Sequence, residues 1–227
     1  MQFPVDLWTT LLPLVVGSAV VPVQIIITVM LLRSSLRTAA AWVAGTAAVR
    51  LIQGLLFGFV FAEIRADSTA SDGPGVVASG LFLVLAVLFY ATATHQALAG
   101  GDRDAPLPKW MNRVESMSGM AAFGAGAVSV AIAPEFWVFT LGALGAIADA
   151  QIGRSSSILT FIAFVALALS GSLAVLAFAA VSPERAATAL ERLVGRLQRN
   201  RRVIAIVLGV VFGTWFLVQA LSGLGLV

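Results

Sequence analysis

The stretch GSAVVPVQIII, residues 17–27, decides the fold class. It lies inside a long apolar run, residues 8–32, which is long enough to cross the hydrocarbon core of a bilayer as a helix. A proline in the middle of such a helix removes one N–H donor and clashes with the carbonyl four residues earlier. Pro22 therefore predicts a broken helix, and Gln24 places a polar side chain directly after the break.

A second stretch, SVAIAPEFWVF at residues 129–139, repeats this pattern. Pro134 lies near the middle of another apolar run, follows small residues, and is followed directly by Glu135. Because a membrane tolerates freed backbone groups only where protein or a water-filled cavity covers them, both breaks are expected inside the protein. Two unrelated proline kinks are the alternative, since proline is frequent in membrane helices.

The composition agrees with a membrane protein. Hydrophobic residues make up 59% of the 227 residues, whereas only 11% are charged, and soluble domains carry about 25%. The apolar runs are continuous and lack the alternation of barrel strands. The sequence predicts an all-α integral membrane protein with six transmembrane helices, at residues 8–32, 38–62, 76–98, 118–147, 155–181 and 203–224.

The order of these spans predicts a 3+3 inverted repeat with broken helices one and four. Residues 1–99 form the first three-helix half, 100–117 a cytoplasmic linker, and 118–227 the second half of one membrane domain. An odd number of spans before the linker makes equivalent helices cross in opposite directions. In such repeats the broken helices of the two halves meet at mid-membrane and form the binding site.

The distribution of positive charge predicts the orientation. If the N-terminus is outside, eleven of the fourteen Lys and Arg residues fall in cytoplasmic loops, a bias that sets topology. We therefore expect a multi-pass protein of the bacterial plasma membrane with both termini outside. The most basic loop contains an amphipathic helix at residues 183–202, which is expected to lie on anionic lipids of the inner leaflet. This helix acts as an orientation signal with lipid contact, or alternatively as a gate that recognises a lipid head group.

Two charges lie deep inside predicted spans. An Arg or Glu at a helix centre costs about 2.5–3.5 kcal/mol on insertion scales, so neither Arg50 nor Glu135 is expected to face lipid tails. They are predicted to pair inside the bundle, either as a structural ion pair or as part of a site that meets a substrate. Thr46 and Gln53 share the Arg50 face. The predicted substrate-binding residues are Pro22, Gln24, Thr46, Arg50, Gln53, Pro134 and Glu135.

Catalytic chemistry finds little support in the chain. Cys is absent and there is one His, so thiol catalysis and histidine metal sites are not expected. The G-x-S-x-G nucleophile elbow, the zincin signature and the P-loop motif are also missing. We expect no enzyme activity, no cofactor and no metal. The net charge of +3 is small and concentrated in membrane loops, so no nucleic-acid partner is expected.

Residues 17–46 and 117–139 resemble spans one, two and four of the glycolipid-addressing (GAP or sulfolipid-addressing) family of actinobacteria, which is grouped with the lysine-exporter superfamily. The resemblance carries over to Pro22, Pro134 and Glu135, whereas Arg50 departs from the family pattern. It implies a six-span transporter that exports a lipid or glycolipid to the cell envelope. An exporter of small solutes such as amino acids, and a non-transporting scaffold for envelope biosynthesis, are the alternatives. A homodimer and a partner within an export complex both stay open.

Overall fold

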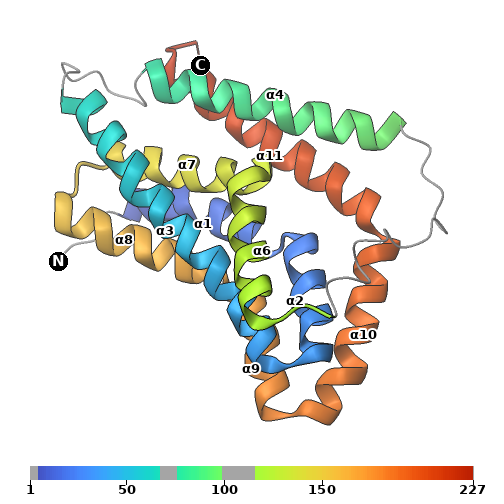
Figure 1. Ribbon diagram of the computed structural model, residues 1–227. Coiled ribbons are helices and arrows are strands. Elements are labelled where there is room, and N and C mark those ends of the chain that lie inside the picture. The colour runs from blue at the N-terminus through green and yellow to red at the C-terminus, as the bar shows by residue number, and fades with distance from the viewer. Residues whose placement is uncertain (1–4, 67–75, 99–115, 227) are drawn as a thin grey trace.

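The computed structural model describes residues 5–66, 76–98 and 116–226, and every regular element within these ranges is an α-helix. The all-helical prediction is confirmed for this part of the chain. Figure 1 shows α4 and α11 side by side along one edge, with the other helices packed below them in this view. In chain order the helices are α1 (Val5–Ala19), α2 (Pro22–Ser34), α3 (Leu36–Ala66), α4 (Val76–Leu98), α6 (Gly119–Ile132), α7 (Pro134–Asp149), α8 (Arg154–Ala168), α9 (Ser170–Val181), α10 (Pro183–Arg199) and α11 (Arg201–Gly223).

The helices are compatible with several membrane crossings. Within the described ranges, α3 and α11 are each long and apolar enough to cross a membrane, over Leu36–Gly58 and Arg202–Gly223. Three bent helix pairs qualify when each pair is taken as one span, which gives two to five candidate spans. The apolar part of α4, Phe82–Leu98, is shorter. The protein is therefore multi-pass, but the expected six spans and the 3+3 repeat are not confirmed.

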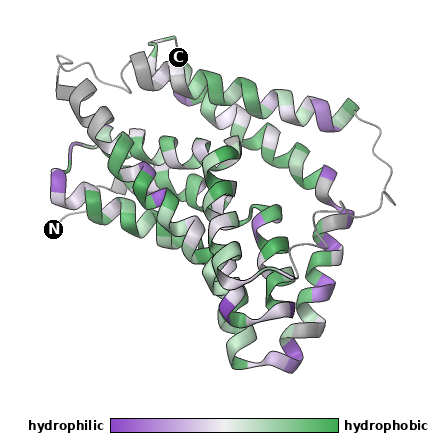
Figure 2. Ribbon diagram, in the orientation of Figure 1, coloured by the Kyte–Doolittle hydropathy of each residue, from purple (hydrophilic) through white to green (hydrophobic). Residues whose placement is uncertain are grey.

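The outer surface of the bundle is apolar. Leu55, Leu56 and Val87 are each 61% exposed, and many other aliphatic side chains on the same helices are open as well. Figure 2 shows that hydrophobic residues predominate along α4 and α11. Apolar surface on this scale marks a membrane or protein contact rather than a face that meets water.

Both predicted helix breaks are present. The chain bends by 46° between α1 and α2, where α2 begins at Pro22. It bends by 67° between α6 and α7, where α7 begins at Pro134. Proline suits the first position of a helix, because the N–H that it lacks would have no partner within that helix. The predicted breaks at Pro22 and Pro134 are thus confirmed.

A third break was not predicted. The span expected without interruption at 155–181 is bent by 56°, with α8 ending at Ala168 and α9 beginning at Ser170. Small residues take the place of proline here, since Ser170, Gly171 and Ser172 follow the bend, and kinks occur at Gly and Ser pairs. A Cβ on Gly171 would collide with the carbonyl oxygen of Ala19. The start of α9 therefore lies directly against the end of α1.

The crossing of α3 and α6 is close enough to bring their backbones into contact. A Cβ on Gly126 would collide with the carbonyl oxygen of Trp42, and a Cβ on Gly45 would collide with that of Phe123. Small residues at such a crossing let helices approach and gain van der Waals contact, which is the main attraction between helices in lipid. This crossing fixes α3, the helix that carries Arg50.

The amphipathic helix predicted at 183–202 is present as α10, but its apolar face has a different environment from the one expected. Leu190 and Val194 are buried in a cluster with Val29 of α2 and Val175 of α9. The helix thus packs on protein rather than resting its apolar face in the lipid of a leaflet. Figure 2 shows hydrophilic residues gathered along α10, and its arginines remain exposed.

Candidate functional site

Arg50 lies near the middle of α3 and is completely buried. Its Nη1 donates a hydrogen bond of 2.7 Å to the hydroxyl oxygen of Ser18, in the last turn of α1. Its guanidinium carbon lies 5.3 Å from the centre of the Phe136 ring, in the first turn of α7. Arg50 therefore joins three helices through a charge-assisted hydrogen bond and a cation–π contact.

The guanidinium is only partly satisfied. Its Nε and Nη2 atoms are buried and have no hydrogen-bond partner among the described residues. A buried donor without a partner costs about 1–3 kcal/mol, and native structures rarely leave one without a reason such as a water, an ion or a ligand. Within the described part of the chain, two nitrogen atoms of Arg50 are therefore left without a partner and could bind a polar group.

Polar groups continue along the same face of α3. Thr46 is buried one turn before Arg50, and its hydroxyl donates to the carbonyl oxygen of Trp42 at 3.0 Å, so it is satisfied within its own helix. Gln53 is buried one turn after Arg50, and neither atom of its amide has a partner in the described ranges. The predicted stripe of Thr46, Arg50 and Gln53 is thus present and enclosed, and its unsatisfied members are Arg50 and Gln53.

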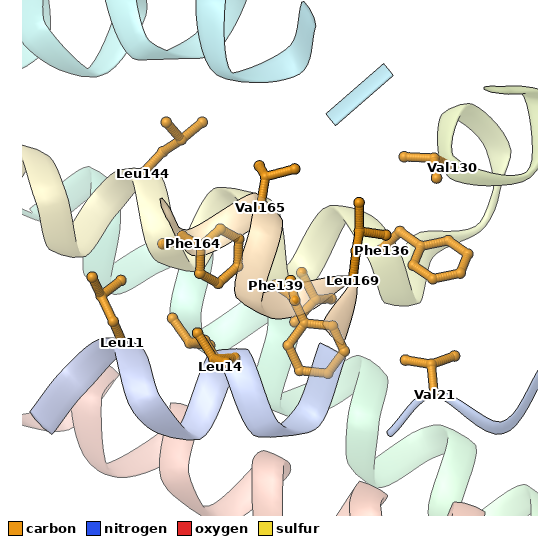
Figure 3. Close-up of a cluster of buried hydrophobic side chains, with 14 of the residues drawn as sticks. Leu11, Leu14, Val21, Val130, Phe136, Phe139, Leu144, Phe164, Val165 and Leu169 are labelled. Atoms are coloured by element: carbon orange, nitrogen blue, oxygen red, sulfur yellow. The ribbon is translucent and has the colours of Figure 1, made fainter. Parts of the chain in front are cut away.

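All three helix breaks lie close to this stripe. Ser18 precedes the first break, Phe136 follows the second, and Gly171, just after the third, lies against the end of α1. Figure 3 shows Val21, Val130, Phe136 and Leu169 gathered on one side of the buried cluster, each at or close to a break. The interruptions therefore converge on one region of the interior instead of being scattered along the bundle.

The helix ends at this region favour an anion. The start of a helix carries a partial positive charge and its end a partial negative charge. Arg50 meets the end of α1 through Ser18, which stabilises its own charge, and it meets the start of α7 through Phe136. The guanidinium and the backbone N–H groups at the start of α7 thus bring positive charge together inside the bundle, and the acidic residue Glu135 belongs to the same turn. A negatively charged group between them would be attracted by both.

The second break also has its own side-chain support. The indole Nε1 of Trp137 donates to the carbonyl oxygen of Ala131 at 2.9 Å, across the junction of α6 and α7. This bond satisfies a carbonyl that the interrupted helix leaves without its usual donor. A side-chain hydrogen bond therefore stabilises the bend between α6 and α7.

Gln24 lies in a neighbouring position on α2. It is buried, its two amide atoms have no partner in the described part of the chain, and its backbone carbonyl accepts a bond of 2.7 Å from Thr28. Thr28 also bonds to Ser172 at 3.3 Å, which connects α2 to α9. The described contacts place Gln24 beside the α2–α9 junction and do not connect it to Arg50.

The remaining predicted residues are placed only in part. Pro22 begins α2 and is half-buried. Pro134 and Glu135 begin α7, next to Phe136, but their side chains lie outside the described residues. The predicted pair of Arg50 and Glu135 therefore stays a prediction. Among the described residues, no group of three or more His, Cys, Asp or Glu side chains is arranged to hold a metal ion.

Sequence reasoning did not identify Ser18, Ser172 or the third break. Ser18 lies within the quoted stretch 17–27 and was counted there only as a small residue. The run Ser170–Gly171–Ser172 was the available signal for the third break, because it places three small residues in the middle of an apolar span.

The helices and their buried polar residues define a class: a multi-pass helical membrane protein with interrupted helices and polar side chains in its interior. The sequence matches the family model described as Sap, sulfolipid-1-addressing protein, over residues 11–222. The chain therefore belongs to the sulfolipid-1-addressing protein family, which confirms the resemblance found in the sequence. No curated protein and no solved structure matches the chain at a significant level.

Proposed function

We propose that this protein exports a lipid or glycolipid to the cell envelope, and that the polar head group passes the membrane at Arg50 while the acyl chains stay in the bilayer. One observation carries the proposal: a fully buried guanidinium retains two nitrogen atoms without a described partner, at the point where three helix breaks meet. A pocket that opens to water would not need a guanidinium inside the bundle. A polar group that crosses the apolar interior of a membrane does need such a polar partner.

The family supports a lipid as the substrate. Its description names the addressing of a sulfolipid, and a sulfolipid carries an acidic sulfur-containing group. A guanidinium presents paired N–H donors that match planar or tetrahedral oxyanions, and such charge-assisted bonds are stronger than neutral ones. We therefore propose an acidic head group for the transported lipid, bound by Nε and Nη2 of Arg50.

The proposed movement is a rocking of two inverted halves. The pairs α1–α2 and α6–α7 are both broken at proline, and each comes first in its half of the chain. In transporters built from inverted repeats, interrupted helices of this kind surround the substrate, and one half moves against the other. The six-span repeat, the plasma-membrane location with both termini outside, and a place in the lysine-exporter superfamily belong to this proposal. So does a transport role without enzyme activity.

A reconstitution experiment tests the proposal. Purified protein is placed in liposomes that contain a labelled sulfated glycolipid or its uncharged analogue, and a membrane-impermeant reagent reports how much label reaches the opposite leaflet. We expect transfer of the sulfated lipid by the wild type, loss of transfer in Arg50→Met, and normal transfer in Arg37→Met, which removes an exposed charge from the same helix. Transfer of a labelled amino acid instead would favour the small-solute alternative. Absence of any transfer under every gradient would favour the scaffold alternative.

A further inference from the structure

The outer face of α10 carries a row of four arginines. Arg185, Arg192, Arg196 and Arg199 are all exposed, and their spacing of seven, four and three residues keeps them within about 60° of one another around the helix. The row is about 21 Å long at 1.5 Å per residue. The buried residues of α10, which include Leu190 and Val194, lie on a different face. The row therefore points away from the packed interior.

The helix carries more positive than negative side chains. Arg33, at the end of α2, lies 3.6 Å from Glu191 of α10, and both side chains are more than half exposed. Glu184 is the other exposed acidic residue of the helix. Along α10 itself, four arginines against two glutamates leave a net charge of +2. The exposed ion pair between Arg33 and Glu191 is worth little at this distance and involves no arginine of the row.

The position of the row restricts its partner. Only Ser182 separates α10 from α9, and only Asn200 separates it from α11, which is a candidate membrane span. The row is therefore attached at both ends to apolar helices and stays at the level where those helices leave the membrane. The apolar face of α10 is already covered by α2 and α9, so α10 cannot enter the acyl region. What remains available is a polar contact at the membrane surface.

We propose that the arginine row of α10 binds the phosphate groups of anionic phospholipids in the membrane that surrounds the protein. Arginines near an anionic leaflet contribute about fivefold each to association, and the folded helix fixes the spacing of the row before any lipid binds. The site is separate from Arg50, and it requires no transport to operate.

Lipid titration monitored by native mass spectrometry tests this site. Purified protein in detergent is titrated with phosphatidylglycerol or with phosphatidylcholine of the same acyl chains. We expect the wild type to prefer phosphatidylglycerol by about tenfold or more, given four arginines. The preference should fall to within about twofold when the four arginines are changed to Gln, and it should survive when they are changed to Lys, which keeps the charge.

Two further measurements make the outcome decisive. Arginines also set membrane topology, so the double variant Arg192→Gln/Arg199→Gln is measured together with the variant in which all four arginines are changed to Gln. We expect the double variant to lose part of the preference for phosphatidylglycerol and to keep its thermal midpoint. An unchanged preference in the folded Gln variants would overturn the proposal. Equal binding of poly-L-glutamate and phosphatidylglycerol to the wild type would also overturn it, because the row would then recognise acidic polypeptides as well as lipids.

Discussion

Replacing Arg50 by Met is the most informative single change. Methionine keeps the unbranched stem of the side chain as far as the position of Nε but removes the charge and all five N–H donors. The wild type holds the guanidinium in a fully buried position with one hydrogen bond of 2.7 Å and one ring contact at 5.3 Å. If Nε and Nη2 bind the head group, the variant loses two charge-assisted bonds of about 1.5–3 kcal/mol each. At about 1.4 kcal/mol per tenfold, affinity should fall by roughly 10² to 10⁴.

Stability should move in the opposite direction. A charged side chain in the middle of a span costs about 2.5–3.5 kcal/mol, and each unsatisfied donor adds to that cost. The bond to Ser18 and the contact with Phe136 offset only part of it. A buried charge without a charged partner is a net cost to the fold, so an apolar side chain in its place should relieve part of that cost. We therefore expect Arg50→Met to raise the thermal midpoint in detergent while transfer of a sulfated lipid is lost.

The assay pairs thermal unfolding with the liposome measurement, and Arg50→Lys serves as the matched control because it keeps the charge but not the guanidinium. A variant that is destabilised by about 3 kcal/mol or more would refute the reasoning, since it would show that Arg50 satisfies a partner needed by the resting fold. A double-mutant cycle with Glu135→Gln then identifies that partner. A coupling energy above about 1 kcal/mol would establish the predicted pair of Arg50 and Glu135.

Three other changes have defined outcomes. Gly126→Ala places a Cβ against a carbonyl oxygen of α3 and should destabilise the protein by about 1–3 kcal/mol. Gly124 lies on the same helix and a Cβ there meets nothing within 4 Å, so Gly124→Ala should not destabilise the protein. Equal thermal midpoints of the two variants would contradict the close crossing of α3 and α6. Glu135→Gln should abolish lipid transfer with an unchanged midpoint, and a fully active variant would remove Glu135 from the site. Tyr90→Phe breaks the 2.7 Å hydrogen bond to Thr214 between α4 and α11 and should lower the free energy of unfolding by about 0.6 kcal/mol. A loss of more than about 1.7 kcal/mol would be too large for one hydrogen bond of this kind.

The sequence predicted those features that depend on one residue type acting locally. Pro22 and Pro134 break their helices because proline lacks a donor wherever it stands, and both breaks are confirmed. The break before Ser170 was missed because small residues permit a bend without requiring one. Its cause is tertiary, since Gly171 must fit against the carbonyl oxygen of Ala19.

The candidate site shows the same division. Arg50 could be identified from its chemistry alone, because a charge inside an apolar span requires an explanation. Its partners Ser18 and Phe136 could not, since a serine and a phenylalanine within apolar helices carry no signal of their own. Likewise, the pattern of α10 revealed an apolar face but not its neighbour, because Val29 and Val175 are as apolar as a lipid tail.

The packing of α10 also limits how the bundle can move. Its buried face contacts Val29 of α2 and Val175 of α9, which lie on opposite sides of the linker between the two proposed halves. Any separation of those halves at this end must first detach α10 from one of them. Because the chain has no native Cys, a disulfide introduced between α10 and α2 would form without competition and would hold the two proposed halves together at this end, whereas one between α10 and α9 would join parts of the same half. If the proposed halves move against each other, the α2–α10 crosslink should therefore stop transport and the α9–α10 crosslink should leave it unchanged.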